Sequence, residues 1–345
     1  MTDFHLLITR WYRQNKRDLP WRNTKNPYFI WLSEIILQQT RVAQGIDYYL
    51  KFIKNYPTIH DLSSAKEQEI LNDWQGLGYY SRARNLHAAA KQIVEDFEGI
   101  FPESHGKIKA LKGVGDYTSA AIASFAFNLP YPVVDGNVFR LLSRYFADDT
   151  PIDSPAGKKR FTAYANELKH DDEIADFNQA MMEMGAVVCT PKKPNCMFCP
   201  LSTSCKANAL QTQLNFPVKK KKTKVTKRYL NYLVLNENTY MIRKRTGKGI
   251  WQNMFEFPCV ETKTESSFEE VSRLAKEVFD FSVQKETISK DKHILSHQTL
   301  HVTFWLVSGK AKDEDLIKTD TLENYPIPRV IDRFLENNPN YVKKK

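Results

Sequence analysis

Four of the five cysteines in the 345-residue chain lie within the single stretch CTPKKPNCMFCPLSTSC. Their spacing is Cys189-x6-Cys196-x2-Cys199-x5-Cys205. Thiols this close together, in a chain that otherwise hardly uses cysteine, indicate a metal or cluster site. Zinc is usually held by two CxxC pairs, whereas one such pair with longer arms suits a [4Fe–4S] cubane bound at four corners. Spacing alone favours the cluster and leaves zinc and free thiols as alternatives.

Disulfides are disfavoured by the compartment that the sequence predicts. The N-terminus has no signal-peptide layout, because its apolar residues recur at helical spacing, and no stretch approaches the ~20 apolar residues of a membrane span. We therefore expect a cytoplasmic protein, where cysteines stay reduced.

Two carboxylates stand in contexts that suit acid–base chemistry. Glu34 lies in FIWLSEIILQQ, where apolar neighbours should strip its hydration, raise its pKa and keep it protonated near neutral pH. Asp135 lies in VVDGNVFRLL, directly before a predicted helix. A protonated and an ionised carboxyl are the pair that glycoside hydrolysis uses. The alternatives are a solvent-facing or capping Glu34 and an Asp135 that only caps its helix.

The stretch LKGVGDYT places Gly113 and Gly115 before another predicted helix. Glycines allow a tight turn, and the N–H groups at a helix N-terminus bind phosphate. The alternative is an ordinary turn, with Tyr117 packed at the start of the helix.

The elements that position these residues fall into two domains. Residues 1–216 show apolar residues at helical period, separated by Gly, Pro, Asp and Asn, and predict an all-α domain. Residues 217–228 form a basic linker that carries seven of the ten net positive charges, either as a solvated run or as a tether for phosphate. Residues 229–345 are rich in β-strand patterns around one clear helix, and they predict a smaller α/β domain.

Several motifs occur in an order that resembles one family. They are LPWR, WLSEIILQQT, GLGYYSRARNLH, LKGVGDYT, VVDGNVFR, FNQAMMEMGA and the cysteine loop. The chain resembles the adenine DNA glycosylase branch of the endonuclease III-like, helix–hairpin–helix DNA glycosylases. The resemblance implies removal of adenine mispaired with 8-oxoguanine or guanine in double-stranded DNA during base excision repair. It also implies a [4Fe–4S] cluster on the four cysteines and a monomeric, nucleoid-associated protein of bacterial type.

The resemblance also assigns roles to the candidate catalytic residues. Glu34 matches the residue that protonates adenine at N7. Asp135 matches the one that stabilises the oxocarbenium-like sugar, with Asn137 helping to hold the site. Tyr117 stands where bifunctional relatives have a lysine, and a phenol cannot form a Schiff base, so we expect a monofunctional enzyme.

Further matches concern recognition of the mispair, since the target base must leave the stack. The match to the pocket around the extruded adenine falls on Arg17, Trp21, Leu37, Gln179 and Met182. The residues matched to entry into the duplex or to contact with the oxidised base are Gln39, Thr40, Leu77 and Tyr79. The hairpin of Gly113, Val114 and Gly115 is expected to grip one phosphate.

The second domain resembles the Nudix fold, but EEVSRLAKEVFDF lacks the REx2EE arrangement that a Nudix hydrolase needs for magnesium. We therefore interpret it as a binding module. HILSHQTLHV resembles the family's loop that senses 8-oxoguanine through a Ser–His pair, here Ser296 and His297. Leu295 replaces the usual Phe, which puts a stacking role there in doubt, and His297 alone also fits an ordinary strand histidine.

Two rival functions remain from the sequence. One is a bifunctional lyase acting on oxidised pyrimidines, which Tyr117 and the long second domain argue against. The other is a non-enzymatic iron–sulfur protein that binds DNA damage or senses redox state. Glu34 and Asp135 together argue against that second reading.

Overall fold

The computed structural model describes residues 3–220, 225–235, 239–309 and 314–339. Residues 221–224 of the predicted basic linker lie outside these ranges. The chain divides into two compact units, one formed by residues 1–64 and 85–221 and the other by residues 65–84 and 222–345. In the described part of the chain, no helix has the length and apolar character to cross a membrane.

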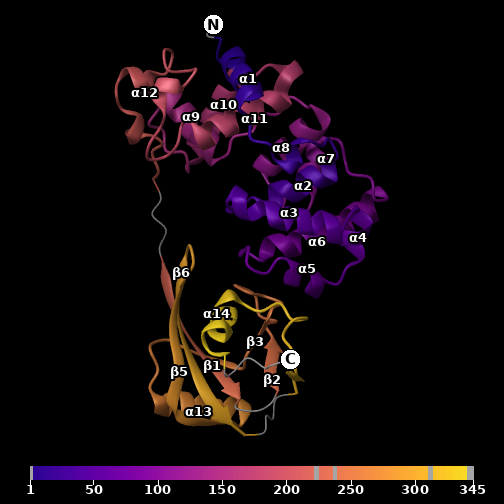
Figure 1. Ribbon diagram of the computed structural model, residues 1–345, viewed down its shortest axis with the longest axis vertical. Coiled ribbons are helices and arrows are strands. Elements are labelled where there is room, and N and C mark those ends of the chain that lie inside the picture. The colour runs from indigo at the N-terminus through magenta and orange to yellow at the C-terminus, as the bar shows by residue number, and fades with distance from the viewer. Residues whose placement is uncertain (1–2, 221–224, 236–238, 310–313, 340–345) are drawn as a thin grey trace. The chain divides into compact units, whose positions relative to one another are not determined.

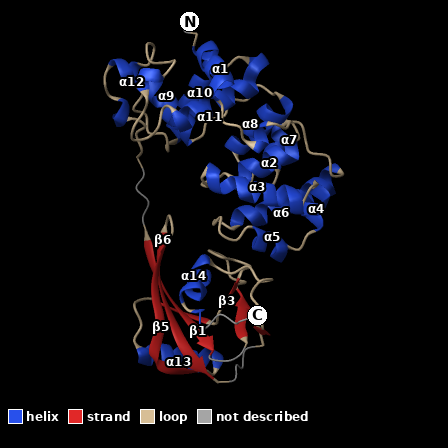
Figure 2. Cartoon of the chain, viewed as in Figure 1, coloured by secondary structure: helices blue, strands red, loops and turns tan. Residues whose placement is uncertain are grey.

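The first unit is helical, as the sequence predicts (Figures 1 and 2). Helix α6 starts in the second unit and continues into this one. The helices are α1 (Phe4–Asn15), α2 (Pro27–Ile36), α3 (Val42–Asn55), α4 (Ile59–Ser64), α6 (Ser81–Phe97), α7 (His105–Ala110), α8 (Asp116–Phe127), α9 (Gly136–Phe146), α10 (Pro155–Leu168), α11 (Ile174–Val187) and α12 (Lys206–Ala209).

Local signals place the helices that carry the candidate site. The side chain of Asn26 accepts a hydrogen bond from the backbone N–H of Tyr28, and Pro27 occupies the first turn, so α2 begins where the sequence predicts. Helix α1 packs on α11 through Phe4, Ile8 and Tyr12, and α11 also packs on α9. This core fixes the three helix segments that surround the candidate site.

The second unit combines strands and helices (Figure 2). One sheet has the order β4-β1-β6-β5, with β1 and β6 parallel and the other pairs antiparallel, and the other sheet has the order β3-β2-β7. Helix α13 packs on β4 and β5 through an apolar core that includes Phe279 and Trp305. The elements are α5 (Glu67–Asp73), β1 (Thr226–Leu235), β2 (Tyr240–Lys244), β3 (Phe255–Glu256), β4 (Cys259–Thr262), α13 (Phe268–Phe279), β5 (Ser282–Ile294), β6 (Gln298–Ser308), β7 (Leu316–Thr319) and α14 (Arg329–Asn337).

Candidate active site

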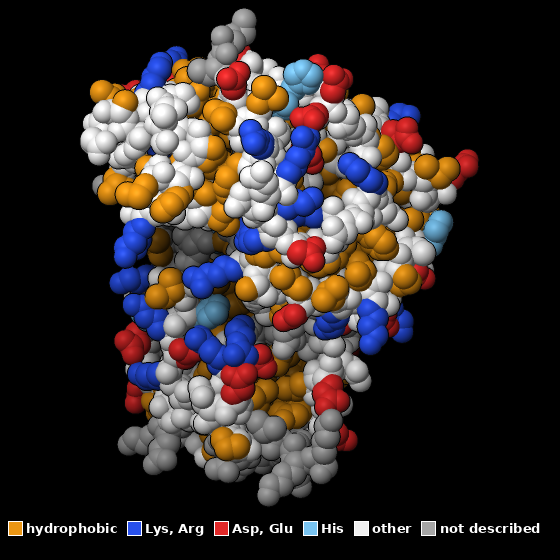
Figure 3. All heavy atoms as spheres, turned by 45° about the horizontal axis from the view of Figure 1, so that its top comes forward, with side chains coloured by type: hydrophobic (Ala, Val, Ile, Leu, Met, Phe, Trp, Pro, Cys, Tyr) orange, Lys and Arg blue, Asp and Glu red, His pale blue; other side chains and the backbone are white. Residues whose placement is uncertain are grey.

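A cavity of about 480 Å³ opens in the helical unit, between the α1–α2 connection, the end of α2 and the first turns of α8 and α9, with α11 on another side. In the space-filling view, Lys and Arg side chains are frequent on the visible face of the helical unit (Figure 3). The cavity gathers eleven residues that the sequence singles out, ten from five separate motifs and Arg17 from just before the first of them. They are Arg17, Trp21, Glu34, Leu37, Gln39, Thr40, Tyr117, Asp135, Asn137, Gln179 and Met182.

Glu34 is the buried acid of this cavity. Helix α2 is apolar on nearly every side, so the carboxyl of Glu34 is only 6% exposed. Its Oε2 accepts a hydrogen bond of 2.7 Å from the Tyr117 hydroxyl. Burial raises the pKa of Glu34 to about 7, the charge of Asp135 adds to the rise, and the Tyr117 hydrogen bond opposes it. Near neutral pH this carboxyl can therefore hold a proton and release it.

Asp135 caps α9 and also lines the cavity, so its capping role does not exclude the predicted catalytic one. Its Oδ1 accepts from the backbone N–H groups of Asn137 (2.9 Å) and Val138 (2.7 Å), and its Oδ2 accepts from the Asn137 amide (2.8 Å). Burial raises the pKa of Asp135, and these donors act in the opposite direction. Because they stabilise the ionised form, Asp135 and Glu34 are held in different environments.

Tyr117 lies in the first turn of α8, where it lines the cavity. Burial, together with the charges of Glu34 and Asp135, raises the pKa of Tyr117 well above its usual value. It therefore remains a neutral phenol that donates its proton to Glu34 in a hydrogen bond. A neutral phenol in this position can orient the carboxyl.

Gln179 presents its amide from α11 toward the same cavity. Its Oε1 accepts a hydrogen bond of 2.6 Å from the Tyr12 hydroxyl, whose pKa burial raises to about 12. Tyr12 therefore stays protonated and fixes the amide orientation. The apolar side chains of Leu37 and Met182 line the cavity with it, giving a mixed surface that suits a flat heterocycle with polar edges.

Glu183 is a charged group in this cavity that the sequence reasoning missed. It is 1% exposed, and it accepts from the Arg17 guanidinium (2.7 and 2.8 Å), the Arg17 backbone N–H (3.1 Å) and the Arg22 guanidinium (2.7 Å). Burial alone would raise the pKa of Glu183, but the hydrogen bonds from the two arginines outweigh it and lower the pKa to about 2. The spacing of Gln179 and Glu183, four apart on α11, could have pointed to it.

The α7–α8 hairpin directly precedes the first turn of α8, and its residues 113–115 are not among those that line the cavity. Gly113 has φ of +78°, and a Cβ atom there would come within 2.6 Å of the Asn85 side chain, so glycine is required. Gly115 precedes the first turn of α8, and Val114 between them is buried. The hairpin therefore has the backbone geometry that the sequence predicts, with N–H groups at the start of α8.

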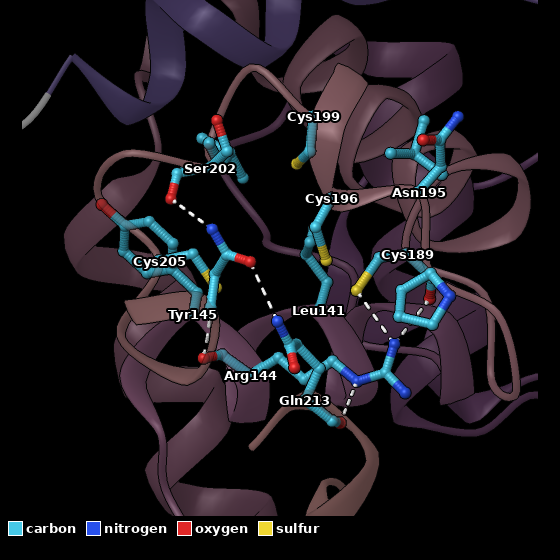
Figure 4. A pocket seen from close by; sticks show the side chains of 14 residues that line it. Leu141, Arg144, Tyr145, Cys189, Asn195, Cys196, Cys199, Ser202, Cys205 and Gln213 are labelled. Carbon is cyan, nitrogen blue, oxygen red and sulfur yellow. Dashed lines mark hydrogen bonds between the residues drawn. The ribbon is translucent and has the colours of Figure 1, made fainter. Parts of the chain in front are cut away.

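The four clustered cysteines line a single pocket beside α9 (Figure 4). Each is a free thiol, and Arg144 donates through Nη1 to the Sγ of Cys189 (3.3 Å). The buried Arg144 also donates to the carbonyls of Thr190, Pro191 and Gln213, which ties the loop to α9. In the described ranges, no three His, Cys, Asp or Glu side chains converge on one position suited to a single ion. The thiols are instead spread around the pocket wall.

A chain of hydrogen bonds joins this loop to the cavity. Arg140 donates through Nε to the Cys189 carbonyl (2.7 Å) and through Nη2 to Asn137 Oδ1 (2.8 Å) and the Gly185 carbonyl (2.6 Å). Asn137 in turn donates to Asp135. The position of Asp135 thus depends on the fold of the cysteine loop.

The remaining predicted recognition residues lie in the second unit. Leu77 and Tyr79 belong to the loop between α5 and α6, where Leu77 is buried and Tyr79 is exposed. Ser296 and His297 form the exposed turn between β5 and β6, which the Leu295 N–H to Gln298 carbonyl bond closes (2.8 Å). Within this unit the hydroxyls of Tyr79 and Ser296 are hydrogen-bonded.

Comparison with known proteins first defines the class. Residues 32–163 match the model of the HhH-GPD superfamily of base excision DNA repair proteins, and residues 231–337 match the NUDIX domain. The structure of a thermostable thymine-DNA glycosylase is similar to 60% of this chain and 95% of its own, with a TM-score of 0.56 and 31% identity. The fold is therefore that of a base excision repair DNA glycosylase with a Nudix-like domain, which confirms the predicted fold class.

Curated relatives then narrow the class. The adenine DNA glycosylase of Buchnera aphidicola subsp. Baizongia pistaciae is 38% identical over 313 residues, which cover 89% of this chain and 87% of that protein. The adenine DNA glycosylase of Buchnera aphidicola subsp. Schizaphis graminum is 35% identical over 307 residues, covering 88% and 87%. The chain belongs to the adenine DNA glycosylase family.

Proposed function

We propose that the chain hydrolyses the N-glycosidic bond of adenine paired with 8-oxoguanine or guanine in duplex DNA, and leaves the strand uncut. The observation that carries this proposal is the pairing in one cavity of Glu34, with a pKa of about 7, and Asp135, whose carboxylate oxygens accept three hydrogen bonds. Cleavage of this bond builds negative charge on the base and positive charge on the sugar. One proton donor and one carboxylate oppose those two charges.

In the proposed reaction, Glu34 gives its proton to N7 of the extruded adenine. The bond between C1′ and N9 breaks, and its electron pair leaves with the base. Asp135 stabilises the positive charge that develops on the sugar. A water molecule then adds to C1′ and loses a proton, which restores the acid. Tyr117 holds the Glu34 carboxyl and, as a phenol, forms no Schiff base with the sugar.

The same cavity supplies groups that match the edges of adenine. The exocyclic amino group of adenine donates hydrogen bonds, and its ring nitrogens accept them. The Gln179 amide nitrogen is a donor because Tyr12 engages the amide oxygen, and Glu183 fixes the two arginines of the cavity by accepting from Arg17 and Arg22. Arg17 acts here by holding Glu183, while Trp21, Leu37 and Met182 supply the apolar contact.

We also propose that Cys189, Cys196, Cys199 and Cys205 hold a [4Fe–4S] cluster. A cubane needs one thiolate at each of four separated corners, and four free thiols spread around one pocket meet that need. The cluster would order the loop that carries Lys192 and Lys193, and the Arg140 hydrogen bonds would carry that order to Asp135. About four iron atoms per chain are expected in protein purified without oxygen, and zinc in their place would contradict the assignment.

The duplex would be held and read outside the cavity. The hairpin of Gly113, Val114 and Gly115 would bind one phosphate, while Gln39 and Thr40 would enter the duplex at the cavity rim. In the second unit, Leu77, Tyr79, Ser296 and His297 would contact the oxidised base. The N7 hydrogen of 8-oxoguanine is a donor that guanine lacks, so a hydroxyl or imidazole acceptor can distinguish the two bases. We expect a monomer that acts in the cytoplasm, on the nucleoid.

The test separates base release from strand cleavage on defined duplexes. Single-turnover reactions on A:8-oxoguanine, A:G and A:T duplexes are analysed with and without hot alkali. We expect adenine release on the first two and an intact abasic strand until alkali is added. Strand cleavage without alkali, together with borohydride trapping of a covalent adduct, would assign the chain to the bifunctional lyases instead.

A further inference from the structure

The loop of residues 76–79, which joins α5 to α6, has an unusual backbone. Gly76 and Gly78 have φ of +102° and +70°, and Tyr79 has φ of +47°. Glycine adopts such values without strain, but a Cβ-bearing aromatic residue rarely does, and it does so only where the surroundings hold it. The Tyr79 ring is 41% exposed, so burial of the ring explains little of this. Some other group must maintain the conformation.

The guanidinium of Arg82 contacts this loop at several points. It is 9% exposed, and its Nη2 donates to the carbonyls of both Leu77 and Gly78 (3.1 Å each). Its Cζ lies 4.9 Å from the centre of the Trp74 ring and 5.9 Å from that of Tyr79. Trp74 adds a second donor to the Gly78 carbonyl through Nε1 (3.0 Å). One cation thus binds the two central carbonyls of the loop and lies over the ring that the loop presents.

We propose that Arg82 is a positioning residue that holds the loop of residues 76–79 in its left-handed conformation, and thereby sets the preference for 8-oxoguanine over guanine opposite adenine. The inference rests on the proposed function, because it takes Leu77 and Tyr79 as residues that contact the oxidised base. A charged donor to a carbonyl binds more strongly than a neutral one, and most strongly where water is excluded. Burial lowers the pKa of Arg82 to about 10, so the cation persists at neutral pH.

Lysine cannot replace Arg82 in this role. Its ammonium is carried on a shorter side chain, and it has no planar face to lie against Trp74 and Tyr79. Arg82→Lys therefore keeps the charge and removes the geometry, while Arg82→Met keeps only apolar volume. Arg84→Lys is the matched control, because Arg84 lies on the same helix but donates to the Gln252 carbonyl (2.9 Å) and not to the loop.

The experiment combines two measurements on the full-length protein. Hydrogen exchange of the amides of residues 76–80 is measured without DNA, and single-turnover adenine release is measured on A:8-oxoguanine and A:G duplexes. In both Arg82 variants we expect loop exchange to rise about tenfold or more, and the ratio of the two rates to fall by roughly tenfold. Arg84→Lys should match the wild type in both. A loss of global stability alone would slow both duplexes equally and leave the ratio intact.

Trp74→Phe provides a variant that leaves Arg82 in place. It removes the second donor to Gly78 and should loosen the same amides to a smaller extent, so the inference stays testable if an Arg82 variant does not fold. Unchanged loop exchange in a folded Arg82→Met protein would overturn the inference, as would a loosened loop with an unchanged rate ratio. A wild type with no preference between the duplexes would refute the proposed recognition of 8-oxoguanine instead, while hydrogen exchange would still report on the contact of Arg82 with the loop.

Discussion

The cavity of the helical unit and the turn between β5 and β6 of the second unit are built in opposite ways. In the cavity, Glu34 and Glu183 are almost fully buried, and each is fixed by hydrogen bonds from residues far away in sequence. At the turn, Ser296 and His297 are exposed, and a short hairpin bond between Leu295 and Gln298 closes the turn. Proton transfer needs a desolvated group with a shifted pKa, whereas reading a base needs polar groups that can reach it.

This contrast between the cavity and the turn predicts how substitutions in each region should change the reaction. Changes in the cavity should alter the rate for every duplex, because they remove the chemistry or the adenine contact. Changes at the turn should alter the ratio between duplexes and leave the chemistry in place.

Glu34→Gln should abolish most adenine release and preserve duplex binding. The amide keeps the shape and can still accept from Tyr117, but it has no proton to give to adenine. General acid catalysis typically contributes about 10²–10⁴-fold, so the single-turnover rate should fall by at least that range. A variant that released adenine at nearly the normal rate would remove Glu34 from the mechanism and leave the cavity without its acid.

The same variant should change how stability depends on pH. The pKa of Glu34 is raised from 4.5 to about 7 in the folded protein, so the folded state holds this proton more tightly than the unfolded state. The stability gained from the proton is present below about pH 4.5 and lost as the pH rises through 7. A shift of this size corresponds to about 3 kcal/mol. Glu34→Gln has no titrating carboxyl at this position, so its free energy of unfolding does not show this loss as the pH rises.

Denaturant unfolding at pH 4.5 and pH 8 provides the measurement. Relative to the wild type, Glu34→Gln should gain free energy of unfolding between the two pH values, by up to about 3 kcal/mol. Groups common to both proteins cancel in this difference. Parallel pH profiles would show that Glu34 is ionised at little cost in the fold, and would break the contrast between a desolvated cavity and an exposed turn.

Ser296→Ala combined with His297→Ala tests the turn between β5 and β6. The double substitution removes the acceptors proposed for the N7 hydrogen of 8-oxoguanine and leaves the linker and the cavity intact. Polar base contacts are worth ~1–3 kcal/mol of discrimination, so the preference for A:8-oxoguanine over A:G should fall by roughly tenfold to a hundredfold. Release from A:G should stay near the wild-type rate. If the full preference survived in both affinity and rate, the turn would not be the reader.

The sequence predicts the helix caps and the buried acid of the helical unit, because the residues next to them in the chain determine these features. Asn26 and Asp135 are recognisable as helix caps from their immediate neighbours, and the apolar flanks of Glu34 predict its desolvation. Glu183 escapes such reasoning because its partner Arg17 lies 166 residues away, and only the packing of α1 on α11 brings them together. The left-handed backbone of Tyr79 is not predicted for a different reason: a residue with a Cβ atom rarely adopts a positive φ, so the residue type gives no signal for it.

In the second unit, strand β5 shows a different limit of prediction from sequence. Strand β5 carries the turn, yet SVQKETISKDKHI has few apolar residues and reads as a polar segment. It forms a strand because β6 offers a long partner: the pairing is in continuous register from Ser289 opposite Phe304 to Ile294 opposite Thr299, and the register shifts between Val283 and Ser289. Pairing that depends on the partner cannot be inferred from the pattern of one strand.

The smallest expected effect concerns the hairpin, which should serve both regions equally. Gly113→Ala places a Cβ at φ of +78°, within 2.6 Å of the Asn85 side chain. The strain of a left-handed alanine is about 1–2 kcal/mol, so affinity should fall by up to roughly thirtyfold if the hairpin must keep this shape to bind phosphate. The loss should be the same for A:8-oxoguanine, A:G and undamaged duplexes, because a phosphate contact carries no sequence information. Gly106→Ala is the control, since Gly106 lies in α7 with open space around its Cβ position. A loss confined to A:8-oxoguanine would mean that the hairpin takes part in reading the mispair, and the division between holding, reading and chemistry would have to be redrawn.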